Sequence, residues 1–488
     1  MRQATAGWVR VMIASAALGC AGDGMLDESE IGSDTAAHTT STPGEAVWVE
    51  YGAAGTRFEH AIGDGGSGAY VSGRFAKQLR LRGFSYDAVN PFSDQPHGFL
   101  AHVDAFGDYE WVRPFEGGNG VSLGVQAIDA SGNLIVRAVV PSSGIDFGCG
   151  PLAAHGPGRS VLIKMTAEAT CLWQIDFRNH EELLPTHISA DTDGDAVIVA
   201  GQWVGVMTID GRTFVTHDYP EELSQEIFVA RLYADGKLDW IQTYGDAPGQ
   251  GEVDNRHEDY SLLDVGVDAN GNLVFTGSFS RALDLGGGHL DPATGDSYVA
   301  KLRRSGNFVY ARQLTGAEPT DLAVADGGPY TLAGTFTATA DFGSETVSTS
   351  GVGGPDVFVV KFNHAGDDQW ARHLHGSARF MRISGLALDP HGNIAVGVNF
   401  TDGSLNLGDR RWVAGRYGAG LIAVLRPISG STGWARASGD EDSGTLLGAP
   451  GFTSNSRVVL GGLMIGSLDA GEGPPPDGAT GFLARYLP

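Results

Sequence analysis

The chain has 488 residues, of which 42% are hydrophobic, 18% are charged and 73 are glycine, and its net charge at pH 7 is −26. This charge disfavours nucleic acid and anionic membrane surfaces as partners. Cationic partners, metal ions and neutral glycans remain open, as does a simple solubility role for the excess acid. The high glycine content, the many apolar β-formers and the lack of long helical periodicity predict an all-β protein with tight turns.

The N-terminus has the pattern of an export signal over residues 1–19. Arg2 and Arg10 supply positive charge, and the apolar run Val11–Gly19 is too short to span a bilayer. The run ends in Ala-Leu-Gly-Cys, which resembles the bacterial lipoprotein cleavage motif, and this resemblance implies that Cys20 is lipidated. The alternative is an ordinary signal peptide with an incidental cysteine. No later apolar run reaches membrane-spanning length.

Residues 20–45 are acidic at first and then rich in serine, threonine and proline, with almost nothing to bury. Such a composition predicts a disordered tether. We therefore expect a globular body held at the bacterial cell envelope, lipid-anchored at the outer membrane or cell surface. Secretion is the alternative.

From residue 46 onward the chain repeats a short apolar phrase of the type Tyr298-Val-Ala-Lys-Leu302. The seven copies are Phe99–Val103, Val161–Met165, Phe228–Leu232, Tyr298–Leu302, Phe358–Phe362, Ile422–Arg426 and Phe482–Tyr486. An aromatic residue recurs at intervals of 60 to 70 residues, at Trp48, Trp111, Trp173, Trp240, Tyr310, Trp370 and Trp434. A fixed period of this size with β-type segments is typical of a repeat architecture.

One unit, residues 262–315, contains four apolar segments separated by glycine- and asparagine-rich turns, which predicts four antiparallel strands. The second strand carries a small residue at its fifth position in most units, where a strand can approach its neighbour closely. These residues are Gly73, Ala138, Gly201, Gly277, Gly334 and Gly462. Val398 is the exception, with Gly397 one place earlier.

Seven such units of about 63 residues predict a seven-bladed β-propeller over residues 46–488. The segment Val47–Tyr51 matches the fourth strand of a unit, and the final segment, residues 481–487, matches the third. We therefore expect these two ends to pair and to complete the last blade, which removes the open edges of the array.

The pattern of these units resembles the bacterial β-propeller repeat of the SBBP type, common in secreted and surface proteins. It combines the phrase around Phe228–Leu232, a following tryptophan, the turn Asp268–Asn272 and an Asp-Phe-Gly element such as Asp341–Gly343. The resemblance covers nearly everything after residue 46. It implies location and architecture, and it carries no catalytic residues.

Two cysteines remain after Cys20, Cys149 and Cys171, both in the second unit. In an exported protein such a pair favours a disulfide, and two separate packing thiols are the alternative. Asp191, Asp193 and Asp195 alternate as in a short calcium loop. They match the register of turns such as Asp268–Asn272, so we prefer a structural turn and predict no metal and no cofactor.

The repeated aromatic residues are expected to pack between blades, although sugar stacking is a second interpretation. No GxSxG, HExxH or Walker-type motif occurs, so catalysis is not supported, and the question of an enzyme stays open with a non-enzyme preferred. His373 and His375 alternate along one strand, with an exposed position as the preferred interpretation.

The connections after the second and fourth strands are long and irregular, for example 76–97, 141–159, 204–226 and 245–260. Strand alternation gathers them on one face, where propellers bind ligands. The acidic stretches 246–259 and 440–442 are candidate sites on that face. We expect a monomeric, non-catalytic scaffold that binds a protein or glycan there. A cell-envelope glycoside hydrolase or lyase is the alternative, and an outer-membrane assembly factor is a third, less suited to the 63-residue period.

Overall fold

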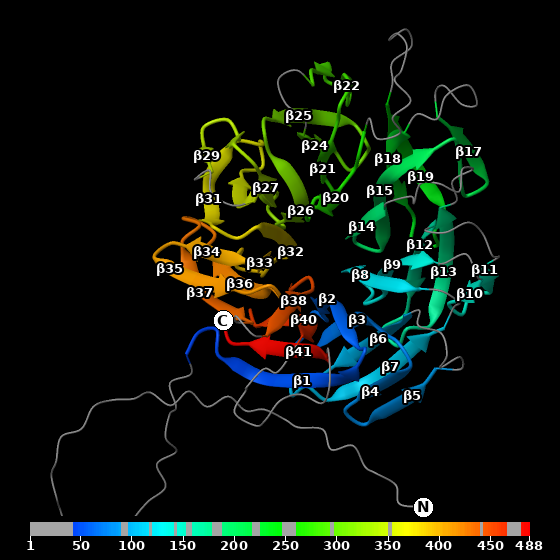
Figure 1. Ribbon diagram of the computed structural model, residues 1–488. Coiled ribbons are helices and arrows are strands. Elements are labelled where there is room, and N and C mark those ends of the chain that lie inside the picture. Colours follow the sequence, from blue (N-terminus) through cyan, green and yellow to red (C-terminus); the bar gives the residue numbers. More distant parts are fainter. Residues whose placement is uncertain are drawn as a thin grey trace, which may run out of the picture.

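The computed structural model describes residues 42–88, 96–116, 120–140, 144–152, 159–177, 188–216, 225–245, 260–292, 297–349, 354–439, 443–465 and 480–488. These residues form strands and turns, and the strands build seven antiparallel sheets around a common axis (Figure 1). The predicted seven-bladed β-propeller is confirmed. No helix within these ranges has the length and apolar character of a membrane span.

Each of the first six blades has four strands in chain order from the axis to the rim. Blades 1 to 3 are β2 (Arg57–Gly63), β3 (Ala69–Phe75), β6 (His97–Val103) and β7 (Tyr109–Phe115); β8 (Ser122–Ile128), β9 (Leu134–Val140), β12 (Arg159–Met165) and β13 (Cys171–Phe177); and β14 (Ile188–Asp193), β15 (Ala196–Val204), β18 (Gln225–Leu232) and β19 (Leu238–Tyr244). Blades 4 to 6 are β20 (Asp264–Val267), β21 (Leu273–Ser278), β24 (Ser297–Leu302) and β25 (Phe308–Leu314); β26 (Glu318–Val324), β27 (Tyr330–Phe336), β30 (Asp356–Phe362) and β31 (Asp368–Gly376); and β32 (Phe380–Leu388), β33 (Ile394–Thr401), β36 (Ala419–Leu425) and β37 (Thr432–Ser438).

Six small hairpins extend from the connections between second and third strands. They are β4 (Gln78–Leu81) with β5 (Phe84–Asp87), β10 (Ile145–Asp146) with β11 (Pro151–Leu152), β16 (Val206–Ile209) with β17 (Arg212–Val215), β22 (Leu283–Asp284) with β23 (His289–Leu290), β28 (Thr339–Asp341) with β29 (Thr346–Ser348), and β34 (Gly403–Leu407) with β35 (Arg410–Ala414). The Asp-Phe-Gly elements at 146–148 and 341–343 lie at the bends of two of these hairpins, β10–β11 and β28–β29. In one of them the Asp146 carboxylate accepts the backbone N–H groups of Gly148 and Gly150 at 2.7 and 3.1 Å.

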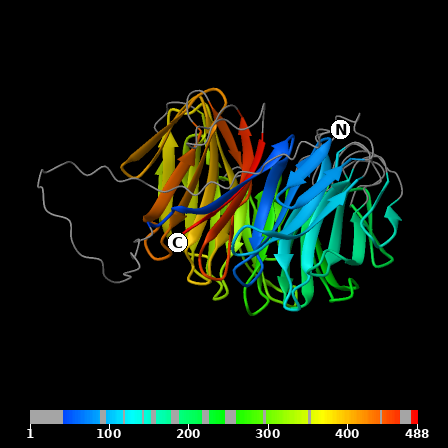
Figure 2. The same ribbon diagram turned by 90° about the horizontal axis from the view of Figure 1, so that it is seen from below.

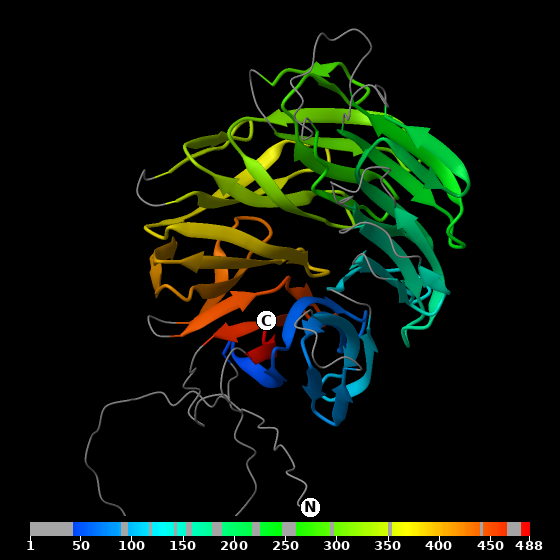
Figure 3. The ribbon, with the colours of Figure 1, turned by 45° about the vertical axis from the view of Figure 1, so that its right-hand side comes forward.

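The seventh blade is completed by the N-terminal strand, as the sequence predicts. Its inner strand is split into β38 (Gly444–Leu447) and β39 (Gly451–Phe452), followed by β40 (Val458–Ile465), β41 (Thr480–Tyr486) and, outermost, β1 (Ala46–Ala54). Val49 lies opposite Ala484, and Tyr51 lies opposite Phe482. The blue β1 and the red β41 lie side by side in Figures 1 and 3.

Residues just before the expected boundary at residue 46 also contact the ring. Gly44 donates its N–H to the carbonyl of Leu487 and lies against the ring of Trp434 from blade 6. In the other blades this position is held by the turn between third and fourth strands. In the seventh blade those two strands belong to opposite ends of the chain, so residues 42–45 fill the place of the turn.

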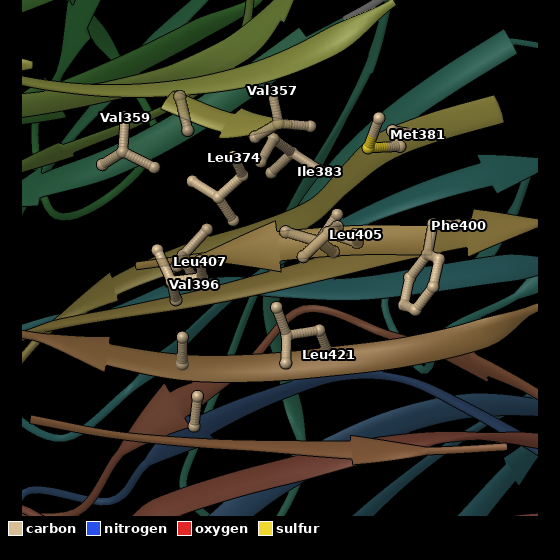
Figure 4. Close-up of a cluster of buried hydrophobic side chains, with 14 of the residues drawn as sticks. Val357, Val359, Leu374, Met381, Ile383, Val396, Phe400, Leu405, Leu407 and Leu421 are labelled. Atoms are coloured by element: carbon tan, nitrogen blue, oxygen red, sulfur yellow. The ribbon is translucent and has the colours of Figure 1, made fainter. Parts of the chain in front are cut away.

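Apolar side chains fill the spaces between adjacent blades. Figure 4 shows the cluster between blades 5 and 6, where Val357 and Leu374 of one sheet face Ile383 and Phe400 of the next. Each blade alone would leave such a face in water, so burial against its neighbours is the main driving force of the ring.

In four of the second strands, the small residue lies beneath a backbone carbonyl of the first strand or of the residues just before it; these residues are Gly73, Gly277, Gly334 and Gly462. A Cβ built on Gly277 would lie 1.9 Å from the carbonyl oxygen of Ser261 and 2.5 Å from the hydroxyl of Tyr298. Gly334 is crowded in the same way by the carbonyl of Glu318. A larger side chain would force the two strands apart. The recurrence therefore reflects close packing within these blades.

Candidate functional site

The ring has two different faces, which we call the turn face and the loop face. The turn face carries the connections within 64–68, 129–133 and their equivalents, together with those between third and fourth strands, such as 104–108. The loop face carries the longer connections and the ends of the strands that lead into them. Figure 2 shows the strands running between these two faces. The acidic stretches 246–259 and 440–442, named above as candidates, lie outside the described residues.

On the turn face, the repeated aromatic residues join neighbouring blades. The indole N–H of Trp48 in blade 7 donates to the carbonyl of Ala105 in blade 1 at 3.3 Å, and that of Trp370 in blade 5 donates to Pro427 in blade 6 at 3.2 Å. Trp173 and Trp240 donate to Ala234 and Arg304 of their next blades. These side chains therefore lie in the interfaces between blades.

The aromatic rings rest on glycines with positive φ in the turn of the next blade. A Cβ on any of six glycines would lie 2.6–3.1 Å from a ring atom; they are Gly44, Gly107, Gly236, Gly306, Gly366 and Gly430. In the interface of blades 1 and 2, Trp111 shares one apolar cluster with Ala169, which also has a positive φ, of 58°. Glycine is favoured here both by its backbone conformation and by the proximity of the ring.

In several blades, the cationic residue opposite the aromatic extends the same interface. Lys164, which is 2% exposed, contacts Asp129 at 2.6 Å and donates to the Asp195 carbonyl of the next blade at 2.9 Å. Lys361 and Arg485 donate in the same way to carbonyls of blades 6 and 1. In blade 6 the residue opposite Trp434 is Val424. The repeat in that blade is therefore Leu421–Leu425, one residue before the expected Ile422–Arg426.

An axial cavity of about 510 Å³ lies between the innermost strands of the ring. Three aspartates from consecutive blades line it, namely Asp191 of β14, Asp264 of β20 and Asp321 of β26. Their convergence would suit acid–base chemistry. The hydrogen bonds of these carboxylates decide whether they serve that purpose.

Each of the three carboxylates accepts a backbone N–H from the innermost strand of the following blade. Asp191 accepts from Val267 at 2.8 Å, Asp264 from Leu322 at 2.9 Å, and Asp321 from Leu386 at 3.0 Å. Asp264 also accepts the hydroxyl of Ser189 at 2.5 Å. The three carboxylates therefore satisfy backbone N–H groups at the edges of these innermost strands and link blades 3 to 6.

Burial alters the protonation of these groups. It raises the pKa of Asp191 to about 7, with a further contribution from the charge of Asp264. Burial also raises the pKa of Asp264, and it raises that of Asp321 well above the usual range, where the negative charge of Asp264 and the hydrogen bond between the two carboxyls add to the effect. Across the cavity, burial lowers the pKa of His60 to about 4.

The three aspartates of the calcium-like pattern have different partners. Asp191 lines the cavity, Asp193 pairs with Arg231 at 2.9 Å and with Arg304 at 2.6 Å, and Asp195 accepts the hydroxyl of Ser131 at 2.8 Å. The register differs from the expected turn, because β14 continues to Asp193 and leaves a two-residue turn. The described residues contain no group of three or more metal-ligating side chains.

The remaining predicted residues are placed as follows. Cys149 and Cys171 form a disulfide with Cα atoms 5.5 Å apart, which ties the hairpin β10–β11 to the outer strand β13. His373 contacts Asp356 at 2.8 Å, and its ring lies 4.9 Å from that of His375. Cys20 and residues 1–41 lie outside the described part of the chain.

The loop face carries one feature that the sequence analysis missed. At the loop-face end of blade 6, two arginines each lie over the aromatic ring of the next residue, as Arg379 over Phe380 and Arg416 over Tyr417. The two dipeptides are far apart in the sequence and lie outside the repeated phrases. The sequence shows one Arg–aromatic dipeptide at 379–380 and another at 416–417, but only the pairing of the strands reveals that they lie close together.

Comparison with protein-family models gives no match, and comparison with curated proteins gives none either. Solved structures with a similar arrangement include a protein of unknown function from Bacteroides caccae, with 11% identity over 70% of this chain and 90% of that chain and a TM-score of 0.34. A polysaccharide lyase of family PL25, an ulvan lyase bound to -[GlcA(1-4)Rha3S]-, has 10% identity over 89% and 95% and a TM-score of 0.41. A gluconolactonase from Xanthomonas campestris has 13% identity over 75% and 90% and a TM-score of 0.31. Such distant matches carry no argument about activity or ligand.

Proposed function

We propose that this protein is an exported, membrane-anchored and non-catalytic β-propeller scaffold that binds a protein or a glycan through its loop face. The proposal includes lipidation at Cys20, a location at the bacterial cell envelope and a relationship to SBBP-type surface propellers. These three parts rest on the N-terminal pattern and on the repeat motif.

The hydrogen bonds of the three axial carboxylates are the observation that supports the non-catalytic part of the proposal. A general acid or base must be able to contact a substrate proton. Asp191, Asp264 and Asp321 instead hold backbone N–H groups of neighbouring blades. Their raised pKa values follow from this buried structural position, so we do not favour the enzyme alternative.

The assignment to the loop face rests on the contrast between the two faces. The described turns of the turn face are short and are held by aspartate–backbone hydrogen bonds, such as those from Asn270 and Asn272 to Asp268 at 2.9 Å. The indole rings also close the gaps between those turns. The loop face bears the exposed Arg–aromatic pairs of blade 6, one at the start of β32 and one in the turn before β36.

Two experiments test this proposal. In a bacterial host, the full chain should fractionate with membranes, and Cys20→Ser should become soluble; equal partition of both proteins would refute the lipid anchor. In a pull-down from an envelope fraction, shortening the connections 204–226 and 245–260 should reduce capture. The matched control is Ile428→Ala on the turn face, whose side chain is 92% exposed. Capture that survives both deletions would contradict the contribution of these two connections.

A further inference from the structure

The two Arg–aromatic pairs of blade 6 are exposed, one at the start of β32 and the other in the turn before β36. The guanidinium carbon of Arg379 lies 5.3 Å from the ring centroid of Phe380, and that of Arg416 lies 4.5 Å from the centroid of Tyr417. Phe380 is 58% exposed and Tyr417 is 37% exposed. Two aromatic rings at strand ends thus face solvent, each with a cation beside it.

Strand pairing brings the two pairs to the same place. Phe380, at the start of β32, lies opposite Thr401 at the end of β33. On the other side of Thr401, a Cβ built on Gly418 would lie 3.0 Å from the threonine methyl group. Because neighbouring strands are about 4.8 Å apart, the backbones of Phe380 and Gly418 are separated by about 10 Å. Tyr417 directly precedes Gly418.

The region is positive in a strongly negative protein. Arg382 follows two residues after Phe380 and is also exposed. Arg382 lies near enough to Arg57 of blade 1 to influence its pKa. Burial lowers the pKa of Arg57 most, Glu59 raises it, and the positive charges of Arg74 and Arg382 lower it further. Arg57 and Arg74 contact Glu59 at 3.7 and 2.5 Å, so the unpaired positive charge among these described residues is that of the blade 6 arginines.

Among the described residues, the carboxylates near this region are engaged by groups other than the blade 6 arginines. Glu59 is engaged by Arg74 at 2.5 Å, and Glu318 accepts the hydroxyl of Thr335 at 3.2 Å. Within the described residues, Arg379, Arg382 and Arg416 form no ion pair, and the nearby Asp402 forms none with them.

A structural Arg–aromatic pair in the same protein looks different. Arg372 lies 5.7 Å from the ring of Trp370, and its guanidinium donates to the backbone carbonyls of Ser429 and Gly430 in the next blade. Arg416 donates only to the hydroxyl of Tyr417 among the described residues. Tyr417 packs through its backbone and Cβ against Gly444 of blade 7, but within the described residues the guanidinium groups of Arg379 and Arg416 donate no hydrogen bond to a neighbouring blade.

We propose that this surface, formed by Arg379, Phe380, Arg382, Arg416 and Tyr417 and called here the arginine–aromatic patch, binds an acidic polysaccharide. Arginine forks pair with carboxylate or sulfate groups, and the exposed rings offer flat apolar platforms for the C–H faces of the sugar rings. The inference rests on the proposed binding role of the loop face and names its ligand class.

The charge distribution favours a glycan over other polyanions. The positive region is confined to a few arginines at one end of the axis, whereas nucleic acid binds along a continuous row of phosphates. An acidic peptide would use the arginines but has no need of two exposed aromatic rings beside them. The requirement for both rings and charges therefore distinguishes a polysaccharide from a peptide.

The test is calorimetric titration of the full chain with chondroitin sulfate, which carries both carboxylate and sulfate groups. Neutral dextran and polyglutamate serve as the comparison ligands. Chondroitin sulfate should bind, more weakly as salt increases, and dextran should not. Arg379→Ala/Arg416→Ala and Phe380→Ala/Tyr417→Ala should each weaken binding at least tenfold. Arg303→Ala, an exposed arginine on the turn face, should leave the Kd within twofold.

Polyglutamate that binds as tightly as chondroitin sulfate, or chondroitin sulfate binding that ignores loss of the two rings, would overturn the glycan assignment. Equal weakening by Arg303→Ala would indicate a general charge effect and would overturn it as well. If chondroitin sulfate does not bind but capture in the pull-down still depends on the long connections, the ligand class is wrong and the proposed function stands. Loss of both results would refute the proposed function itself.

Discussion

Replacement of Trp48 by alanine tests how strongly the N-terminal strand closes the ring. Trp48 is 1% exposed, its ring lies against Gly107, and its N–H donates to the carbonyl of Ala105 at 3.3 Å. Removing a buried tryptophan side chain costs about 3–5 kcal/mol, which includes the cavity left behind. We therefore expect Trp48→Ala to lower the free energy of unfolding by about that amount, in urea denaturation followed by circular dichroism.

Trp370→Ala provides the matched control within the chain. Trp370 is 5% exposed, lies against Gly430 and donates to a carbonyl of the next blade at 3.2 Å, but both of its blades are continuous in sequence. If β1 holds blade 7 as tightly as the internal interfaces are held, the two variants should lose similar stability. A loss below about 1 kcal/mol for Trp48→Ala, with the full loss for Trp370→Ala, would refute closure by β1.

Three further predictions concern the turns, the axis and the disulfide. Gly430→Ala should lower the melting temperature, because the residue has φ of 62° and the added Cβ would lie 2.6 Å from an indole carbon; an unchanged value would contradict the ring–glycine packing. Asp191 has a pKa of about 7 when folded and near 4 when unfolded, so the folded state binds more protons and stability falls as pH rises between these values. Because the pKa of His60 is lowered to about 4, this group makes stability rise with pH over part of the same range. The test is therefore the free energy of unfolding of wild type minus that of Asp191→Asn, which should become smaller from pH 5 to pH 7. Cys149→Ser/Cys171→Ser should lose about 3 kcal/mol of stability for a loop of this length, and wild type treated with reductant should match the variant.

Much of the fold could be predicted because the same local chemistry recurs in every unit. The turn Asp268–Asn272, the phrase Tyr298–Leu302 and the following aromatic residue each specify one step of a blade. Their period gives the number of blades, and the unmatched ends predict the pairing of β1 with β41. These predictions depend on local sequence motifs and on the number of repeats, and neither requires knowing which distant residues come into contact when the chain folds.

The site was harder to predict because it depends on register and on long-range pairing. A turn shorter than its equivalents moves Asp191 out of the expected loop and into the axial cavity. Whether its carboxylate serves catalysis or structure is decided by the N–H of Val267, which belongs to another blade. The proximity of Phe380 and Tyr417 similarly appears only once β32, β33 and β36 are paired.

The central claim is that the polar groups at the axis maintain the ring, whereas those at the loop face bind. One titration with chondroitin sulfate tests both halves on two variants. Asp191→Asn should keep the wild-type Kd within twofold while altering stability with pH, and Arg379→Ala/Arg416→Ala should keep the wild-type stability while weakening binding at least tenfold. Loss of binding in Asp191→Asn, with undiminished binding in the arginine variant, would contradict the claim.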